Sequence, residues 1–515
     1  MLEGTSAPVA AAASESNALS QRWLLRGALA SSLLLFALRL HVARGTGFGD
    51  AEALYMSYAL HPQPAYLDHP GLVGMVARWI GRGQAPTPEA THLFAAVLAT
   101  LIPWIGALGA RAAGASRAGS LATALALIWV PELAIGLFAL TPDLLLAVFW
   151  LGALGLAALA LRSEPRSFRA LLATLGAGGL IGLAFLAKIS GGLLGAALLA
   201  TLLSGSARAR LRTFAPWGAL GLGLVLAAPV VLWELGNGWP MLTHRLVSSQ
   251  AQAGLSFRNL GALLGGQLAY VSPPFLIAAA YLARDLWRRR ADDLVSRMLF
   301  FACVVPAVPL ILLCLWSRVA EPHWLAPAYL ALTLHLGRRA VIGRVLATAS
   351  IATGAAIALF AWLWVMTPLP MKLLGTAYRA RYDLANDLFA WGPGRQLLEQ
   401  AVDQARLDSR RLPVVVGPHY IVCAQAQAAL GARVPVGCNS PIRDDFDDWY
   451  PRQRWLDAQV VLYVQDDRFD VDPKVELPNR VVSGVASVEV RRAGVVVRTI
   501  RVTRLDKLTG VGSLP

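Results

Sequence analysis

Residues 143–161, DLLLAVFWLGALGLAALAL, decide the fold class of this chain. After Asp143 every residue is apolar or glycine, and a run of about 20 such residues is what a helix needs to cross a bilayer. Arginines follow at positions 162, 166 and 169, and basic residues are typical of the cytoplasmic ends of spans. The stretch therefore predicts a membrane-spanning helix whose Asp143 end faces away from the cytoplasm.

The composition extends this interpretation to most of the chain. Of the 515 residues, 56% are hydrophobic and only 15% are charged, which is too apolar for a soluble protein of this size. The net charge is +15, but the arginines cluster between apolar runs as topology signals, so we expect no nucleic-acid binding. About eleven spans are predicted, near residues 24–43, 90–110, 118–138, 143–161, 169–187, 189–204, 214–234, 260–282, 298–316, 324–337 and 342–366.

The loops between these runs predict the orientation. If the N-terminus is cytoplasmic, every alternate loop is rich in arginine, as expected for cytoplasmic loops. Residues 1–21 lack the basic start and apolar core of a cleavable signal, so we expect a disordered cytoplasmic tail. The prediction is a multi-pass protein of the cytoplasmic (inner) membrane, with a transmembrane domain over residues 22–367.

The distinctive polar residues gather in the opposite, extracytoplasmic set of loops. They occur in GDAEALY, YLDHPGL, LTPD, AKIS, ELGNGWPMLTHR and SRVAEPHW. Within the first outer loop, 45–89, the segments 51–60 and 70–82 have helical apolar spacing but are too short to cross, so we expect amphipathic helices along the interface. A transporter would hold ionisable residues near the midplane. The pattern instead favours a site at the membrane surface, open to a lipid headgroup.

Several of these motifs occur together in one known family. Asp50-Ala51-Glu52-Ala53-Leu54-Tyr55, Tyr66-Leu67-Asp68-His69-Pro70, Thr141-Pro142-Asp143, Ala187-Lys188 and Glu321-Pro322-His323-Trp324 through Tyr329 follow in order. This series resembles the protein O-mannosyltransferase-like family of GT-C fold glycosyltransferases, which is similar to the aminoarabinose transferases that modify lipid A. The resemblance implies transfer of a sugar from a polyprenyl-phosphate donor.

The resemblance also implies residue roles. A carboxylate can take the proton of the acceptor, and the catalytic candidates are Asp50, Glu52 and Asp68. Asp68 either shares the role of base, orients the acceptor or holds a metal ion. The adjacent Asp-Glu pair of the family is split here by Ala51, so the base is either Asp50 or Glu52, with alignment on Ala53 favouring Glu52. Residues for binding the donor phosphate, whose negative charge needs cations and hydrogen-bond donors, or the acceptor are Tyr66, His69, Asp143, Lys188, Arg318, Glu321 and His323.

The sequence departs from the family pattern at two further positions. Gly71 replaces the second proline of the Asp-His-Pro-Pro motif, and His323 replaces the asparagine of Pro-Asn-Trp. These changes bear on the acceptor, which is a lipid, a glycan or a protein, and leave the reaction class unchanged. No His/Cys set at metal spacing is present, and a divalent cation held by carboxylates is compatible with the sequence.

The composition changes after residue 367, where apolar runs become short and charge rises. Short apolar runs predict strands at 412–417, 429–436 and 459–464, and alternating apolar residues predict a hairpin formed by 485–492 and 494–505. Helices are expected near 384–406 and 418–430. We expect an extracytoplasmic α/β domain over residues 368–515. Cys423 and Cys438 form a plausible disulfide in an oxidising compartment, whereas Cys303 and Cys314 lie in an apolar span and are expected to be inert.

Three classes of function make different predictions about where the ionisable residues lie. The leading one is a polyprenyl-phosphate-sugar-dependent glycosyltransferase acting on the outer membrane face. The alternative is a polyprenol-linked sugar flippase or transporter, which predicts ionisable residues along the midplane. The third is a sensor or assembly protein anchored by its helices, which would not need charged residues at so many outer span ends.

Overall fold

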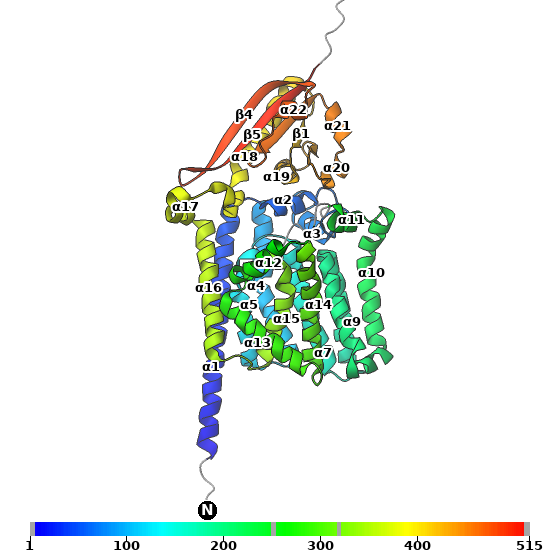
Figure 1. The fold of residues 1–515 in the computed structure, drawn as a ribbon, viewed down its shortest axis with the longest axis vertical. Coiled ribbons are helices and arrows are strands. Elements are labelled where there is room, and N and C mark those ends of the chain that lie inside the picture. The colour runs from blue at the N-terminus through cyan, green and yellow to red at the C-terminus, as the bar shows by residue number, and fades with distance from the viewer. Residues whose placement is uncertain (1–5, 249–253, 317–320, 509–515) are drawn as a thin grey trace, which may run out of the picture.

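The computed structural model describes residues 6–248, 254–316 and 321–508, and it is a helical region beneath a smaller C-terminal domain (Figure 1). The long or apolar helices of the helical region are α1 (Ser6–Gly45), α4 (Pro88–Ala112), α5 (Arg117–Trp129), α7 (Pro142–Arg162), α8 (Phe168–Ala187), α9 (Gly192–Leu203), α10 (Phe214–Gly236), α12 (Phe257–Tyr270), α13 (Pro273–Arg289), α14 (Leu294–Trp316), α15 (Ala326–Arg338) and α16 (Arg344–Met366). Its short helices are α2 (Asp50–Ser57), α3 (Leu72–Ile80), α6 (Pro131–Gly136), α11 (Pro240–Leu246) and the 3₁₀ turns Ile189–Gly191, Gly205–Arg212 and Pro322–Leu325.

Every predicted span coincides with a helix or a pair of helices, but not all are continuous. Among the described residues, 7 helices are long and apolar enough to cross a membrane, or up to 9 if each sharply bent pair counts as one span. The predicted span 118–138 is divided at Pro131, because the residue before a proline avoids the helical conformation. The predicted span 260–282 is bent by 106° between α12 and α13, where Pro273 begins the second helix. The helix α1 starts at Ser6, within the segment predicted to be a loose tail.

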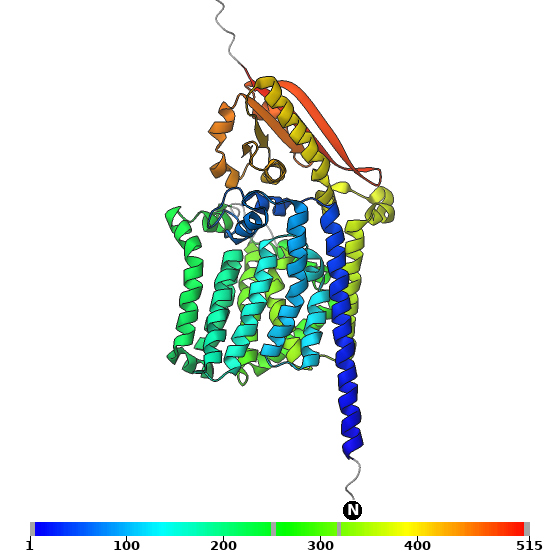
Figure 2. The same cartoon turned by 180° about the vertical axis from the view of Figure 1, so that it is seen from behind.

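The two ends of the helical region differ in their neighbours. One end, here called the domain-side end, lies beneath the C-terminal domain and carries α2, α3 and α11 (Figures 1 and 2). At the other, the basic end, arginines from separate loops contact the ends of neighbouring helices: Arg162 donates to Ala112 O, Arg210 to Ala160 O and Arg338 to Ala113 O. The basic loops predicted to be cytoplasmic therefore lie together, at the end where the N-terminal part of α1 projects (Figure 1).

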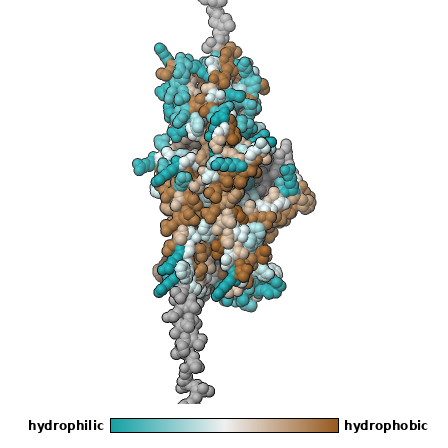
Figure 3. All heavy atoms as spheres, turned by 90° about the vertical axis from the view of Figure 1, so that its left-hand side faces the viewer, coloured by the Kyte–Doolittle hydropathy of each residue, from teal (hydrophilic) through white to brown (hydrophobic). Residues whose placement is uncertain are grey.

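Hydrophobic surface surrounds the helical region as expected for contact with lipid. Figure 3 shows this belt below a C-terminal domain whose surface is more hydrophilic. The helix α10 illustrates it, since Leu224, Val225 and Leu232 are each at least 60% exposed. Apolar side chains at such positions are favourable only in an apolar surrounding, so the belt supports the predicted membrane-spanning class.

The C-terminal domain is built on a five-stranded sheet of order β2-β1-β3-β5-β4. The strands are β1 (Val414–Gly417), β2 (Val436–Cys438), β3 (Val460–Asp466), β4 (Arg480–Arg492) and β5 (Val495–Lys507). The strand β1 is parallel to β2 and β3, whereas β5 is antiparallel to β3 and β4. The helices are α17 (Leu369–Leu374), α18 (Asp387–Ser409), α19 (Tyr420–Leu430), α20 (Asp445–Trp449), α21 (Arg452–Asp457) and α22 (Pro473–Glu476), with 3₁₀ turns at Gly375–Ala377, Ala380–Tyr382 and Leu384–Asn386.

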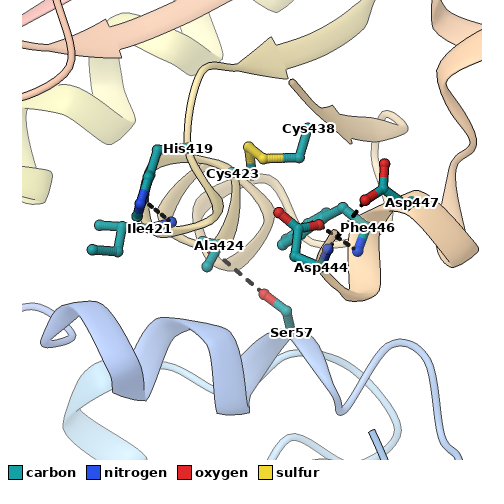
Figure 4. Close-up of a disulfide and its surroundings, with 9 residues drawn as sticks. All are labelled: Ser57, His419, Ile421, Cys423, Ala424, Cys438, Asp444, Phe446 and Asp447. Atoms are coloured by element: carbon teal, nitrogen blue, oxygen red, sulfur yellow. Dashed lines mark hydrogen bonds between the residues drawn. A yellow bond between two sulfur atoms is a disulfide. The ribbon is translucent and has the colours of Figure 1, made fainter. Parts of the chain in front are cut away.

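The predicted α/β character of this domain is confirmed, with one strand shorter than expected. Of the predicted strand 429–436, only Val436 is in β2, because α19 continues to Leu430 and ends at Gly431 with φ of 58°. The predicted disulfide is present: Cys423 of α19 is bonded to Cys438 at the end of β2, with Cα atoms 5.8 Å apart (Figure 4). It ties α19 to the sheet, while the opposite side of α19 faces α2, where Ser57 Oγ donates to Ala424 O.

Candidate active site

Two of the predicted binding residues meet where α7 begins and α8 ends. Thr141 caps α7 by accepting from Leu144 N–H, and Pro142 occupies the first turn, where its missing N–H costs nothing. This start places Asp143 at the domain-side end. Lys188, the residue that terminates α8, donates from Nζ to both Asp143 carboxylate oxygens, at 2.8 and 3.0 Å. Antiparallel neighbouring helices bring these two residues together from positions 45 apart in sequence.

The predicted 321–329 motif supplies another side of the same cluster. His323 Nε2 lies 3.9 Å from Asp143 Oδ2, and His323 Nδ1 lies 3.9 Å from Glu321 Oε2. Burial lowers the pKa of His323, partly opposed by the nearby Asp143, so the neutral ring is favoured at pH 7. Arg318, a further predicted binding residue, lies outside the described residues.

The first outer loop brings Asp68 and His69 to this cluster. Asp68 Oδ1 lies 3.2 Å from Arg245 Nη2 and 3.7 Å from His244 Nε2. His69 is buried, and its Nε2 lies 3.2 Å from the same Arg245 nitrogen. Burial, followed by the positive charges of Arg245 and Lys188, holds the pKa of His69 well below its usual range. A neutral ring can accept a hydrogen bond there.

Sequence reasoning missed His244 and Arg245 as site residues. Both lie in α11, whose last turn carries these two basic side chains at the domain-side end. Thr-His-Arg at the end of an outer loop could have indicated them. Basic residues are usually enriched in cytoplasmic loops, so their presence in an outer loop suggests a function. We call Asp68, His69, Asp143, Lys188, Arg245 and His323 the ionic cluster.

The two candidate bases of α2 face different ways. Glu52 is 2% exposed, and both its oxygens are occupied: Oε2 lies 2.9 Å from His92 Nε2, and Oε1 accepts from Leu140 N–H at 3.0 Å. Asp50 instead faces the C-terminal domain. Its Oδ2 accepts from Arg468 Nη1 at 2.5 Å, while its Oδ1 has only long contacts of 3.5 Å, from Gln425 and Arg468.

Two half-buried tyrosines lie beside these groups. Burial raises the pKa of Tyr420, the first residue of α19, and the charges of Asp68 and Asp50 add to the effect. The ring of Tyr55 in α2 lies 5.5 Å from that of His69, and burial, followed by the charges of Asp68 and Asp143, raises the pKa of Tyr55. Both phenols therefore stay protonated at neutral pH and can donate hydrogen bonds to an anionic or hydroxyl-bearing substrate.

Tyr66, predicted to bind substrate, has a different position. Its ring stacks on Tyr58 at 3.6 Å, and its hydroxyl donates to His61 O at 2.7 Å and accepts from Gln63 N–H. The following residue, Leu67, donates its N–H to the buried carboxylate of Asp445, whose pKa burial raises to about 7. These contacts hold the loop that carries Asp68 and His69.

The structure therefore brings together Asp68, His69, Asp143, Lys188 and His323, with Glu321 beside them. Glu52 and Tyr66 support the surrounding chain, and Asp50 lies at the edge nearest the C-terminal domain. Within the described ranges, no group of three or more His, Cys, Asp or Glu side chains is arranged to hold a metal ion.

Comparison with known proteins agrees with this architecture. Residues 84–233 match the sequence family described as dolichyl-phosphate-mannose-protein mannosyltransferase. Comparison with curated proteins gives no significant match. Among solved structures, ArnT from Cupriavidus metallidurans bound to undecaprenyl phosphate is similar with a TM-score of 0.59 and 15% identity, over 93% of this chain and 98% of that chain.

Two further structures are similar over most of this chain. The apo state of the same ArnT gives a TM-score of 0.61 at 15% identity, covering 93% of this chain and 97% of that one. The Archaeoglobus fulgidus oligosaccharyltransferase tethered with an acceptor peptide gives 0.50 at 13% identity, covering 86% and 69%. The family resemblance is thus confirmed by the match over residues 84–233, and the chain has an ArnT-like GT-C fold.

Proposed function

We propose that this protein transfers a sugar from a polyprenyl-phosphate donor to an acceptor at the domain-side end, which we assign to the extracytoplasmic face. The observation that carries the proposal is the ionic cluster, where Lys188 and Arg245 lie beside carboxylates at the ends of separate helices. Such a site combines cations for a phosphate with groups that can move a proton. The similar ArnT structure with undecaprenyl phosphate supports a lipid-linked donor.

The donor phosphate is bound in this proposal by the cationic members of the cluster. Lys188 and Arg245 supply positive charge, and His69, His323 and Tyr55 supply polar groups around them. Negative charge grows on the leaving phosphate as the bond to the sugar breaks, so these groups stabilise the transition state more than the ground state. Their position at the ends of spans fits a phosphate whose lipid chain remains in the bilayer.

Asp50 is our choice for the base that takes the proton of the acceptor. A base needs a carboxylate oxygen that the acceptor can reach. Both oxygens of Glu52 are occupied at about hydrogen-bond length inside the protein, whereas Oδ1 of Asp50 has only the two 3.5 Å contacts. This reverses the preference for Glu52 that the motif alignment suggested, and Asp68 is the next candidate.

The decisive experiment compares Asp50→Asn and Glu52→Gln in purified protein with labelled polyprenyl-phosphate sugars, including a mannosyl donor because of the family description. Lipid, glycan and peptide acceptors are offered, with and without a chelator to test for a divalent cation. Asp50→Asn should lower transfer by about 10²–10⁴-fold with donor binding retained. Glu52→Gln should mainly lower the melting temperature, because its carboxylate holds α2 against α4.

Two results would contradict the proposal. Wild-type protein that moves the labelled lipid across a proteoliposome membrane without transferring sugar would identify the flippase alternative. Near-normal transfer by Asp50→Asn would move the base to another carboxylate, and Asp68→Asn is then the variant that locates it.

A further inference from the structure

Arg468 extends from the C-terminal domain to the candidate base. It follows β3 by two residues, and its side chain is 14% exposed. Its guanidinium contacts three carboxylates: Asp50 at 2.5 Å, Asp466 at 2.7 Å and Asp387 at 3.3 Å. Asp466 belongs to the same domain, whereas Asp50 belongs to α2 in the first outer loop, so this one side chain joins two distant parts of the sequence.

The contacts around Asp50 hold one carboxylate oxygen closely and the other only through longer contacts. Arg468 Nη1 binds Oδ2, and Oδ1 has only contacts of 3.5 Å. A carboxylate at the start of a short helix can rotate about its side-chain bonds unless one oxygen is anchored. Anchoring Oδ2 fixes the direction in which Oδ1 points, and a base is effective only when its accepting oxygen is held toward the acceptor.

The backbone around Asp50 is held by the same domain. Gln425 Nε2 of α19 donates to Phe48 O at 3.0 Å, and Gly47 N–H donates to Leu388 O of α18 at 2.6 Å. The entry into α2 is therefore already attached by contacts that do not involve Arg468. This means that Arg468 is not needed merely to bring the two parts together, and its specific contribution is to the Asp50 carboxylate.

The charge balance gives Arg468 a second effect. Asp50, Asp387 and Asp466 face one another across this guanidinium, and the one other cation bonded to them within the described residues is Arg498, which is paired with Asp387. Carboxylates at close range oppose each other's ionisation unless a cation lies between them. Arg468 therefore separates Asp50 from the two carboxylates of the C-terminal domain while it binds all three.

We propose that Arg468 is a positioning residue for the reaction, one that aims the Asp50 carboxylate, so that the C-terminal domain is part of the reaction centre. This inference rests on the proposed function, in which Asp50 is the base. It assigns the domain a role beyond covering the outer loop, because a loop after β3 provides the contact that prepares α2 for proton transfer.

The test uses the full-length protein with Arg468→Gln, Arg468→Lys and a matched control, Arg504→Gln. Arg504 is an arginine of the same sheet that pairs with Asp408 and Asp506, away from α2. For each protein, kcat and KM for the donor are measured together with the melting temperature. Arg468→Gln should lower kcat at least about 10-fold with little change in donor KM, because the donor phosphate is bound elsewhere.

The split between kcat and KM separates positioning from a merely structural role. Without its anchor the Asp50 carboxylate should act less often in the productive orientation, so Arg468→Gln should lose kcat while donor KM and the melting temperature stay close to those of Arg504→Gln. Arg468→Lys restores the charge but not the forked geometry, so it should recover kcat only in part. Arg504→Gln should leave kcat and donor KM unchanged.

The failure of this inference differs from failure of the proposed function. If Asp50→Asn is inactive while both Arg468 variants have the kcat and donor KM of Arg504→Gln, only the role of Arg468 is overturned. If Asp50→Asn transfers sugar normally, the base assignment and this inference fail together. Should Arg468→Gln not fold, Arg468→Lys decides alone, because an unchanged kcat in that variant contradicts the need for the guanidinium geometry.

Discussion

The two ends of the helical region use charged side chains differently. At the basic end, Arg338 is 7% exposed and donates to Asp293 at 2.7 Å, to Ser296 Oγ at 3.1 Å and to Ala113 O. At the domain-side end, Lys188 donates within the described residues to Asp143, which remains 35% exposed. Arg338 is paired entirely with protein groups, so it connects helices. The Lys188–Asp143 pair is partly exposed, so its unused hydrogen-bonding sites can bind a ligand.

We expect the two ends to lie in different compartments, and cysteine labelling tests this directly. In protein lacking Cys303 and Cys314, single cysteines replace Ser206 at the basic end and Ser487 on β4, two exposed positions. A membrane-impermeant maleimide should label Ser487→Cys in intact cells and Ser206→Cys only after permeabilisation, because alternate basic loops are cytoplasmic.

The disulfide-bonded pair Cys423 and Cys438 should stay unlabelled in this assay unless the protein is reduced. Labelling with the reverse sidedness would place the ionic cluster in the cytoplasm and remove the extracytoplasmic assignment.

Lys188→Met should have a large effect on activity and a small one on stability. The substitution keeps the length and apolar stem of the side chain but removes the charge proposed to stabilise the leaving phosphate, so transfer should fall by about 10²–10³-fold. Because the same phosphate is present in the donor, its KM should also rise. Transfer and melting temperature are measured on the same preparation, and wild-type turnover by this variant would mean that the ionic cluster does not bind the phosphate.

Arg338→Met is the matched substitution at the basic end, with the opposite expected result. Removing this guanidinium leaves Asp293 without its 2.7 Å partner and Ala113 O without its side-chain donor. The free energy of unfolding should fall by about 1.5–3 kcal/mol, the usual range for hydrogen bonds to charged groups. Transfer per folded molecule should stay close to wild type, and a selective loss of turnover without loss of stability would erase the distinction between the two ends.

Composition and local patterning were sufficient to predict the membrane class, the positions of the apolar helices and the change to an α/β domain near residue 367. These features depend on the length of apolar runs and on alternation within strands, which are local properties. The interruptions at Pro131 and Pro273 are local as well, but the apolar runs continue across them, so hydropathy alone joins helices that the backbone separates.

The motifs also predicted most of the ionic cluster, because Asp68, His69, Asp143, Lys188 and His323 all lie at predicted outer ends. They did not distinguish Asp50 from Glu52, which are two residues apart on one helix. At 3.6 residues per turn such side chains point about 200° apart, so one faces His92 of α4 and the other faces Arg468 of the C-terminal domain. The sequence by itself determined that a carboxylate stands at this loop. Only the packing of α2 between the helices and the domain decided which carboxylate is fully buried and which stays partly accessible, because that choice depends on neighbours hundreds of residues away.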